Sequence, residues 1–268
     1  MSRAILAFAM VSQLNQLAAE LRRAQETRSP CPPLRGRLPE GDVDAAYKVQ
    51  QANTDFWVAA GRRIVGRKIG LTSPAVQKQL GVSQPDCGVL YADMAVGDGA
   101  ALRVDSLLQP KVEAEIALVL DRSLTVTNPT AADVLRATAY VVPAIEIVAS
   151  RIANWDIGIV DTIADNASSG AFALGGPARR IDGIDLTGCA MRTRIGEAVV
   201  SSGSGRDCLG SPLNAAVWLA TRMQEVGMPL QAGDVILTGA LGKMAAVRKG
   251  DTVAAEIAGI GTVSVTFE

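Results

Sequence analysis

Two short apolar runs with glutamates embedded in them constrain the fold of this chain most strongly. Residues 112–120 read VEAEIALVL, and residues 141–149 read VVPAIEIVA. Glu113 and Glu115 lie two positions apart, so on a strand both side chains point to the same face. That face continues with apolar residues and the opposite face is wholly apolar, which predicts a strand covered on both sides. The chain is therefore expected to build a covered sheet that holds carboxylates in its interior.

Carboxylates buried in this way need a specific partner. Two charges about 5 Å apart repel each other by about 3 kcal/mol at an effective dielectric constant of about 20. A buried pair must therefore become protonated, pair with a cation or bind a metal. Glu146 in the second run adds a third carboxylate, and oxygen ligands of this kind suit Mg²⁺ or Mn²⁺. A solvated strand face for Glu113 and Glu115, and an exposed strand edge for Glu146, are the alternatives, because sequence spacing does not show that the three side chains meet.

The chain contains no histidine, which excludes several classes of catalytic site. Ser-His-Asp and Cys-His nucleophiles, His-ligated zinc and imidazole acid–base chemistry are all ruled out. Catalysis must then use carboxylates, lysine, hydroxyls, thiols or a metal held by oxygen. The four cysteines, at positions 31, 87, 189 and 208, form no CxxC pair. Scattered thiols are typical of a protein in the reducing cytoplasm.

Charge and hydropathy argue against two kinds of partner. Lys and Arg number 26 against 27 Asp and Glu, a net charge of −1, which argues against nucleic-acid binding. No apolar stretch approaches the roughly 18 residues needed to span a membrane. The mildly apolar start continues as a helical pattern rather than as a secretory signal. We therefore expect a cytoplasmic protein with neither a nucleic-acid nor a membrane partner.

The N-terminal part of the chain has the pattern of two helices. Apolar residues recur at steps of four and three from Met10 to Ala24, which predicts an amphipathic helix. After a proline-rich break, residues 42–61 predict a second helix with Asp42 as its N-cap. Residues 1–61 are therefore interpreted as a helical N-terminal part.

Residues 62–268 are interpreted as a catalytic domain of α+β class. The segments with β-type composition, separated by glycine and proline, are 64–70, 112–120, 140–148, 235–238, 252–257 and 262–267. The last two flank a Gly-Ile-Gly hairpin signal. One clear helix is predicted over 213–226, where Ser211 precedes Pro212 as N-cap. The strands are too irregularly spaced for βαβ units, which favours a mixed sheet or roll.

Several polar residues in this domain have both a structural and a functional interpretation. Lys68 lies between two glycines on a predicted strand, which leave room beside its ammonium group; a surface lysine on an edge strand is the alternative. Asp86 lies in the string QPDCG, whose composition by itself predicts only a turn. The polar segment 165–170 predicts a loop, and residues 233–239 predict a turn, a strand and a glycine exit.

Five long segments, in order, resemble the 2-keto-4-pentenoate hydratase family of the fumarylacetoacetate hydrolase superfamily. They are GRKIGLTSPAVQKQLGVSQPDCGVLYADM (66–94), QPKVEAEIALVL (109–120), SRIANWDIGIVDTIADNASSG (150–170), CLGSPLNAAVWLA (208–220) and GDVILTGALG (233–242). The similarity runs over nearly the whole chain. It implies the fumarylacetoacetase-like mixed β roll or sandwich, with a helical N-terminal part.

The resemblance also implies roles for the residues singled out above. The metal triad of the family would fall on Glu113, Glu115 and Glu146, which would hold Mg²⁺ or Mn²⁺. The catalytic lysine would be Lys68, and the acid–base aspartate would be Asp86. A lysine near a divalent ion should have a lowered pKa, which would help it to act near neutral pH.

The resemblance also implies roles for further positions. Thr72, Ser168 and Thr238 would supply polar contacts to the substrate. Ser211 and Lys243 depart from the residues usual in the family. Ser211 is suited to a helix N-cap. If Lys243 lies near the pocket, it would favour a substrate with a second carboxylate.

The activity implied is the addition of water to 2-hydroxypenta-2,4-dienoate, giving 4-hydroxy-2-oxopentanoate, a step in the meta-cleavage degradation of aromatic compounds. The alternatives are 4-oxalocrotonate decarboxylase, a hydratase for a longer dienoate and, more remotely, an acylpyruvate hydrolase or a non-catalytic binding subunit. The resemblance further implies a homo-oligomer built on pentamers, and association with the pathway decarboxylase is a further expectation.

Overall fold

The computed structural model describes residues 3–39, 41–73, 77 and 84–268, with side chains from residue 10 onward. Part of the segment 66–94 that carries the family resemblance therefore lies outside the described residues. The helices are α1 (Arg3–Thr27), α2 (Val43–Ala59), α4 (Ala131–Ala137), α5 (Ile159–Ala164) and α6 (Pro212–Glu225). The strands that build the site are β1 (Ile64–Gly70), β2 (Asp86–Tyr91), β5 (Lys111–Leu120), β6 (Thr138–Val148), β7 (Ser169–Leu174) and β10 (Val235–Leu237). The remaining strands are β3 (Ala95–Val96), β4 (Ala101–Leu102), β8 (Ala190–Ile195), β9 (Ala198–Ser204), β11 (Ala245–Ala246), β12 (Thr252–Ile257) and β13 (Gly261–Phe267).

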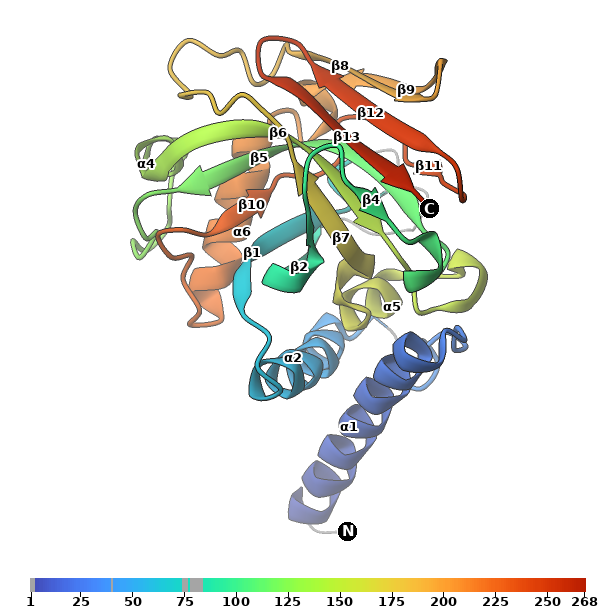
Figure 1. Cartoon of the computed structure of the whole chain (residues 1–268). Helices are drawn as coiled ribbons and strands as arrows, with labels where there is room; N and C mark the ends of the chain where they lie inside the picture. The colour runs from blue at the N-terminus through green and yellow to red at the C-terminus, as the bar shows by residue number, and fades with distance from the viewer. Residues whose placement is uncertain (1–2, 40, 74–76, 78–83) are drawn as a thin grey trace.

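Two mixed sheets form the body of the molecule (Figure 1). The larger sheet has the order β2-β1-β10-β5-β6-β7-β3, with β11 added to β5. The smaller sheet has the order β4-β13-β12-β8-β9 and lies above it in Figure 1. Antiparallel β5 and β6 form the centre of the larger sheet, and their register sets Glu113 opposite Glu146. The α+β mixed-sheet prediction is confirmed by this arrangement.

The main hydrophobic core lies between the two sheets and extends beneath α4 and α6. It joins Ile116 and Ile145 of the larger sheet to Val265 of the smaller sheet and Leu219 of α6. The predicted hairpin is present, because β12 and β13 pair in antiparallel fashion. This core fixes β5 and β6 from one side and so gives the embedded glutamates a rigid base.

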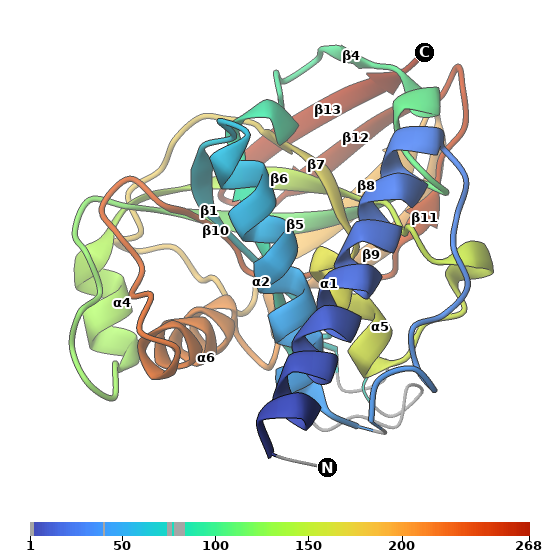
Figure 2. The same cartoon turned by 90° about the horizontal axis from the view of Figure 1, so that it is seen from below.

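The N-terminal helices lie side by side across one end of the larger sheet (Figure 2). Asp42 caps α2 by accepting a hydrogen bond from the Ala45 amide at 2.9 Å. A second core joins α1, α2 and α5, in which Leu17 and Leu21 of α1 pack with Ile163 of α5. Met10, the first residue of the predicted apolar stripe, is exposed. None of the described helices is long and apolar enough to cross a membrane.

Most predicted elements lie within a residue or two of the observed ones. The strands predicted over 64–70 and 252–257 coincide with β1 and β12, and Ser211 caps α6 with Pro212 in its first turn. One prediction was wrong: Asp86 begins strand β2 instead of forming a turn, because pairing with β1 outweighs the local turn composition. The loop predicted over 165–170 is confirmed in part: a tight turn includes Asn166–Ser168, but β7 already begins at Ser169 through pairing with β6.

Candidate active site

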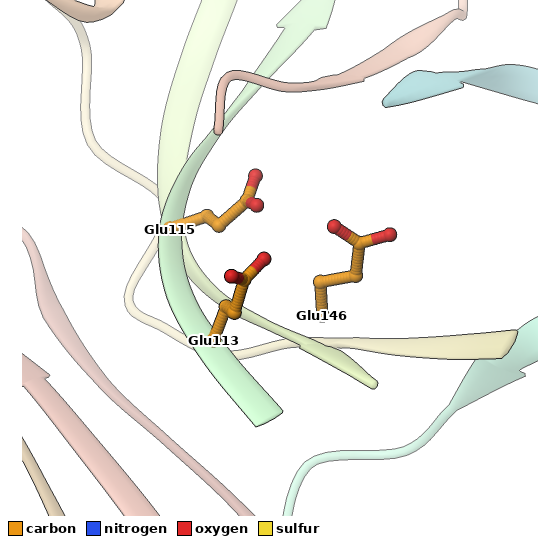
Figure 3. Close-up of side chains that lie close together, drawn as sticks. All are labelled: Glu113, Glu115 and Glu146. Carbon is orange, nitrogen blue, oxygen red and sulfur yellow. The ribbon is translucent and has the colours of Figure 1, made fainter. Parts of the chain in front are cut away.

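Three glutamates converge at the centre of the larger sheet (Figure 3). Glu113 and Glu115 lie on the same face of β5, and Glu146 lies directly across from Glu113 on β6. Ligand oxygens of the three side chains all lie within 4.8 Å of one another. Glu115 and Glu146 are fully buried, whereas Glu113 is half-buried. The interpretation of these residues as an exposed edge or a solvated face is therefore wrong, and their role as ligands is taken up below.

Two buried oxygens of this triad have no hydrogen-bond partner among the described residues. Glu115 Oε2 accepts from the Gly239 amide at 2.8 Å, and Glu146 Oε1 accepts from the Ser169 hydroxyl at 3.4 Å. Glu115 Oε1 and Glu146 Oε2 are buried and unpaired among the described atoms. Buried polar atoms of this kind call for a further partner. An all-oxygen donor set fits a hard divalent cation, so these residues can bind a metal ion.

Burial and mutual repulsion both favour protonation of the metal-free triad. Burial, followed by the charge of Glu146, raises the pKa of Glu113 to about 7. Burial, with repulsion from Glu146 and Glu113, raises the pKa of Glu115 well above its ordinary value. Burial also raises the pKa of Glu146, although the Lys68 ammonium opposes this. Binding of a cation would reverse these shifts by favouring the ionised carboxylates.

Lys68 projects from β1 toward the same cluster. Its Nζ lies 3.1 Å from Glu146 Oε1 and donates to the Ala167 carbonyl at 2.8 Å. Burial by itself lowers the pKa of Lys68, but the surrounding carboxylates, led by Glu146 and Asp86, together outweigh burial and raise the pKa. Lys68 is therefore a buried cation held among acids, and its interpretation as a surface lysine is wrong.

Asp86 completes the group of ionisable side chains. It stands opposite Gly70 in the β1–β2 register, and its Oδ2 accepts from the Thr162 hydroxyl at 3.0 Å. Its Oδ1 is buried and unpaired within the described part of the chain. Burial raises the pKa of Asp86, although Lys68 opposes this. A Cβ at Gly70 would overlap Asp86 Oδ1, so this glycine makes room for the carboxyl group.

Three of these side chains, Lys68, Asp86 and Glu113, border a cavity of ≈ 540 Å³. Its lining includes Lys68, Asp86 and Glu113, together with Thr72 and Ser168 from the predicted set of substrate contacts. The Ser168 hydroxyl is buried and finds no partner among the residues described. The structure therefore brings two of the three predicted contact residues to the cavity.

Thr238 does not reach the cavity. Its side chain is fully buried and its hydroxyl donates to the Ile116 carbonyl at 2.8 Å. Thr238 immediately precedes Gly239, whose amide donates to Glu115. Its hydrogen bond to β5 therefore helps to position the triad. Ser211 caps α6, while Lys243 is exposed and lines the outer part of the cavity.

Some lining residues were not singled out from the sequence. Thr162, Trp155 and Ile157 come from α5 and the segment before it. Thr162 meets Asp86 across 76 positions of sequence, and nothing in its local pattern marks that contact. The nearest signal was indirect, because Thr162 lies inside the 150–170 segment that resembles the family.

Comparison with known proteins agrees with this fold. The family model for the fumarylacetoacetate (FAA) hydrolase C-terminal region matches residues 63–268. Among curated relatives, 2-keto-4-pentenoate hydratase 2 of Dechloromonas aromatica is 60% identical over 250 residues, covering 93% of this chain and 95% of that protein. The 2-hydroxyhexa-2,4-dienoate hydratase of Comamonas testosteroni is 41% identical, covering 88% of this chain and 90% of that protein.

A solved structure extends the likeness to three dimensions. The 4-oxalocrotonate decarboxylase from Pseudomonas putida G7, complexed with magnesium and adipate, superposes with a TM-score of 0.92 at 33% identity. The match covers 96% of this chain and 98% of that chain. The likeness therefore includes the N-terminal helices as well as the two sheets.

Proposed function

The chain belongs to the fumarylacetoacetate hydrolase family, and on this premise we propose that it is a hydro-lyase that hydrates 2-hydroxypenta-2,4-dienoate (2-keto-4-pentenoate). The product would be 4-hydroxy-2-oxopentanoate. The observation that carries the proposal is the cavity lined by Lys68, Asp86 and Glu113, in which Glu113 belongs to the acidic triad and Lys68 lies 3.1 Å from Glu146. Relatives named 2-keto-4-pentenoate hydratase, up to 60% identical to this chain, support the choice of substrate.

Glu113, Glu115 and Glu146 would hold Mg²⁺ or Mn²⁺. Glu115 and Glu146 each have a buried oxygen with no partner in the described part of the chain, which supports this assignment, as does the absence of any histidine from the sequence. A divalent ion held there would supply Lewis-acid stabilisation of negative charge on the carboxylate and C2 oxygen of a 2-keto acid. It would also offset the acidic charges that raise the pKa of Lys68.

Proton transfer would fall to Lys68 and Asp86. The C2 hydroxyl of the dienol loses its proton as the ketone forms, and C5 gains a proton. Water then adds across the C3–C4 double bond, with its hydroxyl at C4 and its proton at C3. Asp86 suits this role because burial raises its pKa, which favours the protonated acid, and its Oδ1 has no competing partner among the described residues.

Thr72 and Ser168 would orient the substrate. Both border the cavity, and the buried Ser168 hydroxyl lacks a partner within the described structure. A hydroxyl in this state can donate to a substrate carboxylate without first breaking another hydrogen bond. The walls formed by Trp155 and Ile157 would limit access of bulk water.

Decarboxylation of a dicarboxylic 2-keto acid is the second candidate function. The exposed ammonium of Lys243 at the outer cavity favours it, because that group can attract a distal carboxylate. The superposition on a 4-oxalocrotonate decarboxylase also favours it, although the identity of 33% is lower than that to the hydratases. A hydratase for a longer dienoate is the third outcome that the cavity volume accommodates.

The test is loss of the dienol ultraviolet absorbance of 2-hydroxypenta-2,4-dienoate after EDTA treatment, with and without added Mg²⁺. Chromatography then identifies the product. Metal-dependent formation of 4-hydroxy-2-oxopentanoate is expected. If the folded, metal-loaded protein releases CO₂ from 4-oxalocrotonate but leaves the dienoate unchanged, the proposed function changes from hydration to decarboxylation.

Replacement of Lys68 by alanine tests the proton-transfer role. We expect kcat to fall by about 100-fold or more, as for loss of an acid–base group, while Mg²⁺ binding measured by calorimetry persists. Lys48→Ala is the matched control, because Lys48 is exposed on α2. Near-normal turnover by the Lys68 variant would remove this residue from the mechanism.

The assembly and the cellular location remain predictions. We propose a cytoplasmic homo-oligomer built on pentamers, on the strength of the family resemblance. Sedimentation equilibrium should then give a mass that is a multiple of five 27.9 kDa chains. Co-purification with the pathway decarboxylase would test the proposed association between the two enzymes.

A further inference from the structure

A turn with a strained backbone borders the cavity, which Ala167 and Ser168 help to line. Asn166, Ala167 and Ser168 follow one another with φ angles of 55°, 50° and 54°. Residues with a Cβ rarely adopt this left-handed conformation, and three in succession are rarer still. Such a turn persists only where the surrounding structure holds it in place.

The turn carries two groups of the proposed active site. The Ala167 carbonyl accepts the hydrogen bond from Lys68 Nζ at 2.8 Å. The Ser168 hydroxyl, which has no partner among the residues described, borders the cavity. Relaxation of the turn toward right-handed angles would move both groups. The position of the Lys68 ammonium group therefore depends on the left-handed conformation of the turn.

The side chain of Asn166 fastens this turn to strand β2. Its Oδ1 accepts from the Val89 amide at 2.7 Å, and its Nδ2 donates to the Val89 carbonyl at 2.9 Å. β2 ends the strand order of the larger sheet, so the amide group of Asn166 occupies the place of a neighbouring strand. This pair of bonds fixes both the distance and the orientation between turn and strand.

Close packing of the turn on β2 reinforces the two hydrogen bonds between Asn166 and Val89, which together form an amide clamp. Gly88 stands opposite Lys68 in the β1–β2 register, and a Cβ at Gly88 would overlap the Asn166 carbonyl. Arg151 holds the two ends of the turn, because it donates to the carbonyls of Asp165 and Ser169. Asn166 is the member of this group whose side chain joins the turn to β2.

We propose that Asn166 is a positioning residue for Lys68 and Ser168. Its amide clamp on Val89 holds the left-handed turn, so that the Ala167 carbonyl directs the lysine ammonium and the Ser168 hydroxyl stays in the cavity. The inference rests on the proposed function, because it assigns Asn166 a part in the turnover carried by Lys68.

Asn166→Gly separates the clamp from the backbone conformation. Glycine adopts positive φ without strain, so this variant removes the side-chain bonds while it keeps the turn accessible. Asn128→Gly is the matched control, because Asn128 also has a positive φ of 51° and lies exposed in a loop away from the cavity. It makes the same asparagine-to-glycine change at a left-handed position, without a contact to the site.

Steady-state kinetics, Mg²⁺ calorimetry and hydrogen exchange of β2 amides are measured on the full-length wild type and both variants. For Asn166→Gly we expect kcat to fall by about tenfold or more, as for a misplaced catalytic group, with a smaller change in KM and retained Mg²⁺ binding. Exchange of the β2 amides should accelerate by about tenfold or more, because the Val89 amide loses its acceptor. Asn128→Gly should match the wild type in all three measurements.

A kcat of Asn166→Gly within about twofold of wild type would overturn the proposal. So would loss of Mg²⁺ binding or of a cooperative melting transition in that variant, which would mark a general structural role. An inactive wild type would instead refute the proposed function. Hydrogen exchange of the β2 amides would then be the test of whether Asn166 holds the turn on β2, and unchanged exchange in Asn166→Gly would overturn that part of the proposal.

Discussion

Thr162 would act on the reaction only through Asp86. Its hydroxyl holds Asp86 Oδ2 at 3.0 Å and leaves Oδ1 without a partner in the described chain. Thr162→Val keeps the shape but removes the donor, so the aspartate loses its fixed orientation. We expect kcat to fall by about tenfold with little change in KM, and Thr162→Ser to restore most of it.

Thr221→Val is the control for this substitution. The Thr221 hydroxyl bonds the Val217 carbonyl within α6, away from the cavity. Steady-state kinetics of the three variants decide the matter. Equal kcat values for Thr162→Val and wild type would show that Asp86 needs no orienting partner.

Glu113 should make metal binding depend on pH. Its pKa in the metal-free site is raised to about 7, first by burial and then by Glu146, while a metal ligand must be ionised. Mg²⁺ affinity should therefore rise as pH increases through about 7, with release of protons on binding. Calorimetry in two buffers of different ionisation enthalpy measures both quantities, and equal affinities about one pH unit below and above that value would contradict this assignment.

At the scale of elements, the missing side chain of Gly70 on β1 allows the carboxyl group of Asp86 on β2 to lie close to Lys68. A Cβ there would overlap Asp86 Oδ1 and would come within 3.3 Å of Lys68 Nζ. Gly70→Ala should therefore lower kcat by about tenfold or more. The backbone itself accepts alanine, because Gly70 is not among the glycines with positive φ.

Gly97→Ala provides the comparison for this prediction. A Cβ at Gly97 would make only an ordinary contact of 3.6 Å with Ala100. Kinetics and thermal melting of both variants test the argument. A Gly70 variant that loses activity only in proportion to its loss of thermal stability would point to general disruption instead.

The elements also show what the sequence could reveal. The apolar runs around Glu113, Glu115 and Glu146 predicted buried strands and a carboxylate cluster, because burial of a charge leaves a visible contrast in composition. Their meeting depends on the β5–β6 register, which local pattern does not encode. The prediction for Asp86 failed at this level, because its strand is specified by pairing with β1.

The residues that support the site were the hardest to foresee. Asn166 and Thr162 act through contacts with β2 that span 77 and 76 positions of sequence. Their own surroundings resemble a polar loop and a short helix, respectively. Family resemblance located the segment, but only the three-dimensional arrangement shows which atoms each side chain holds.

At the scale of the whole molecule, the acidic cluster should make the metal-free protein less stable. Burial and two neighbouring carboxylates raise the pKa of Glu115. A carboxyl whose folded pKa is raised binds more protons when folded, so the associated stability is present below the unfolded pKa, about 4.5, and is lost as pH rises. Glu115→Gln removes this penalty while its side-chain oxygen can still accept from Gly239.

The metal-free Glu115→Gln variant should therefore melt a few degrees above the metal-free wild type at neutral pH. The difference should shrink at acidic pH, and added Mg²⁺ should stabilise only the wild type strongly. Glu197→Gln, at an exposed position, is the control in calorimetric melting. A lower melting temperature for Glu115→Gln than for wild type without metal would contradict this account.

The place of β10 in the larger sheet has a consequence for protein synthesis. This strand lies between β1 and β5, yet its residues leave the ribosome long after both neighbours. A nascent chain must therefore carry β1 and β5 with unpaired edges, which invite association with other chains or capture by chaperones. The Gly239 amide that holds Glu115 follows β10 directly. The three-carboxylate site is thus completed only when its last strands have been translated, so a chain released early would have neither a closed sheet nor a finished site.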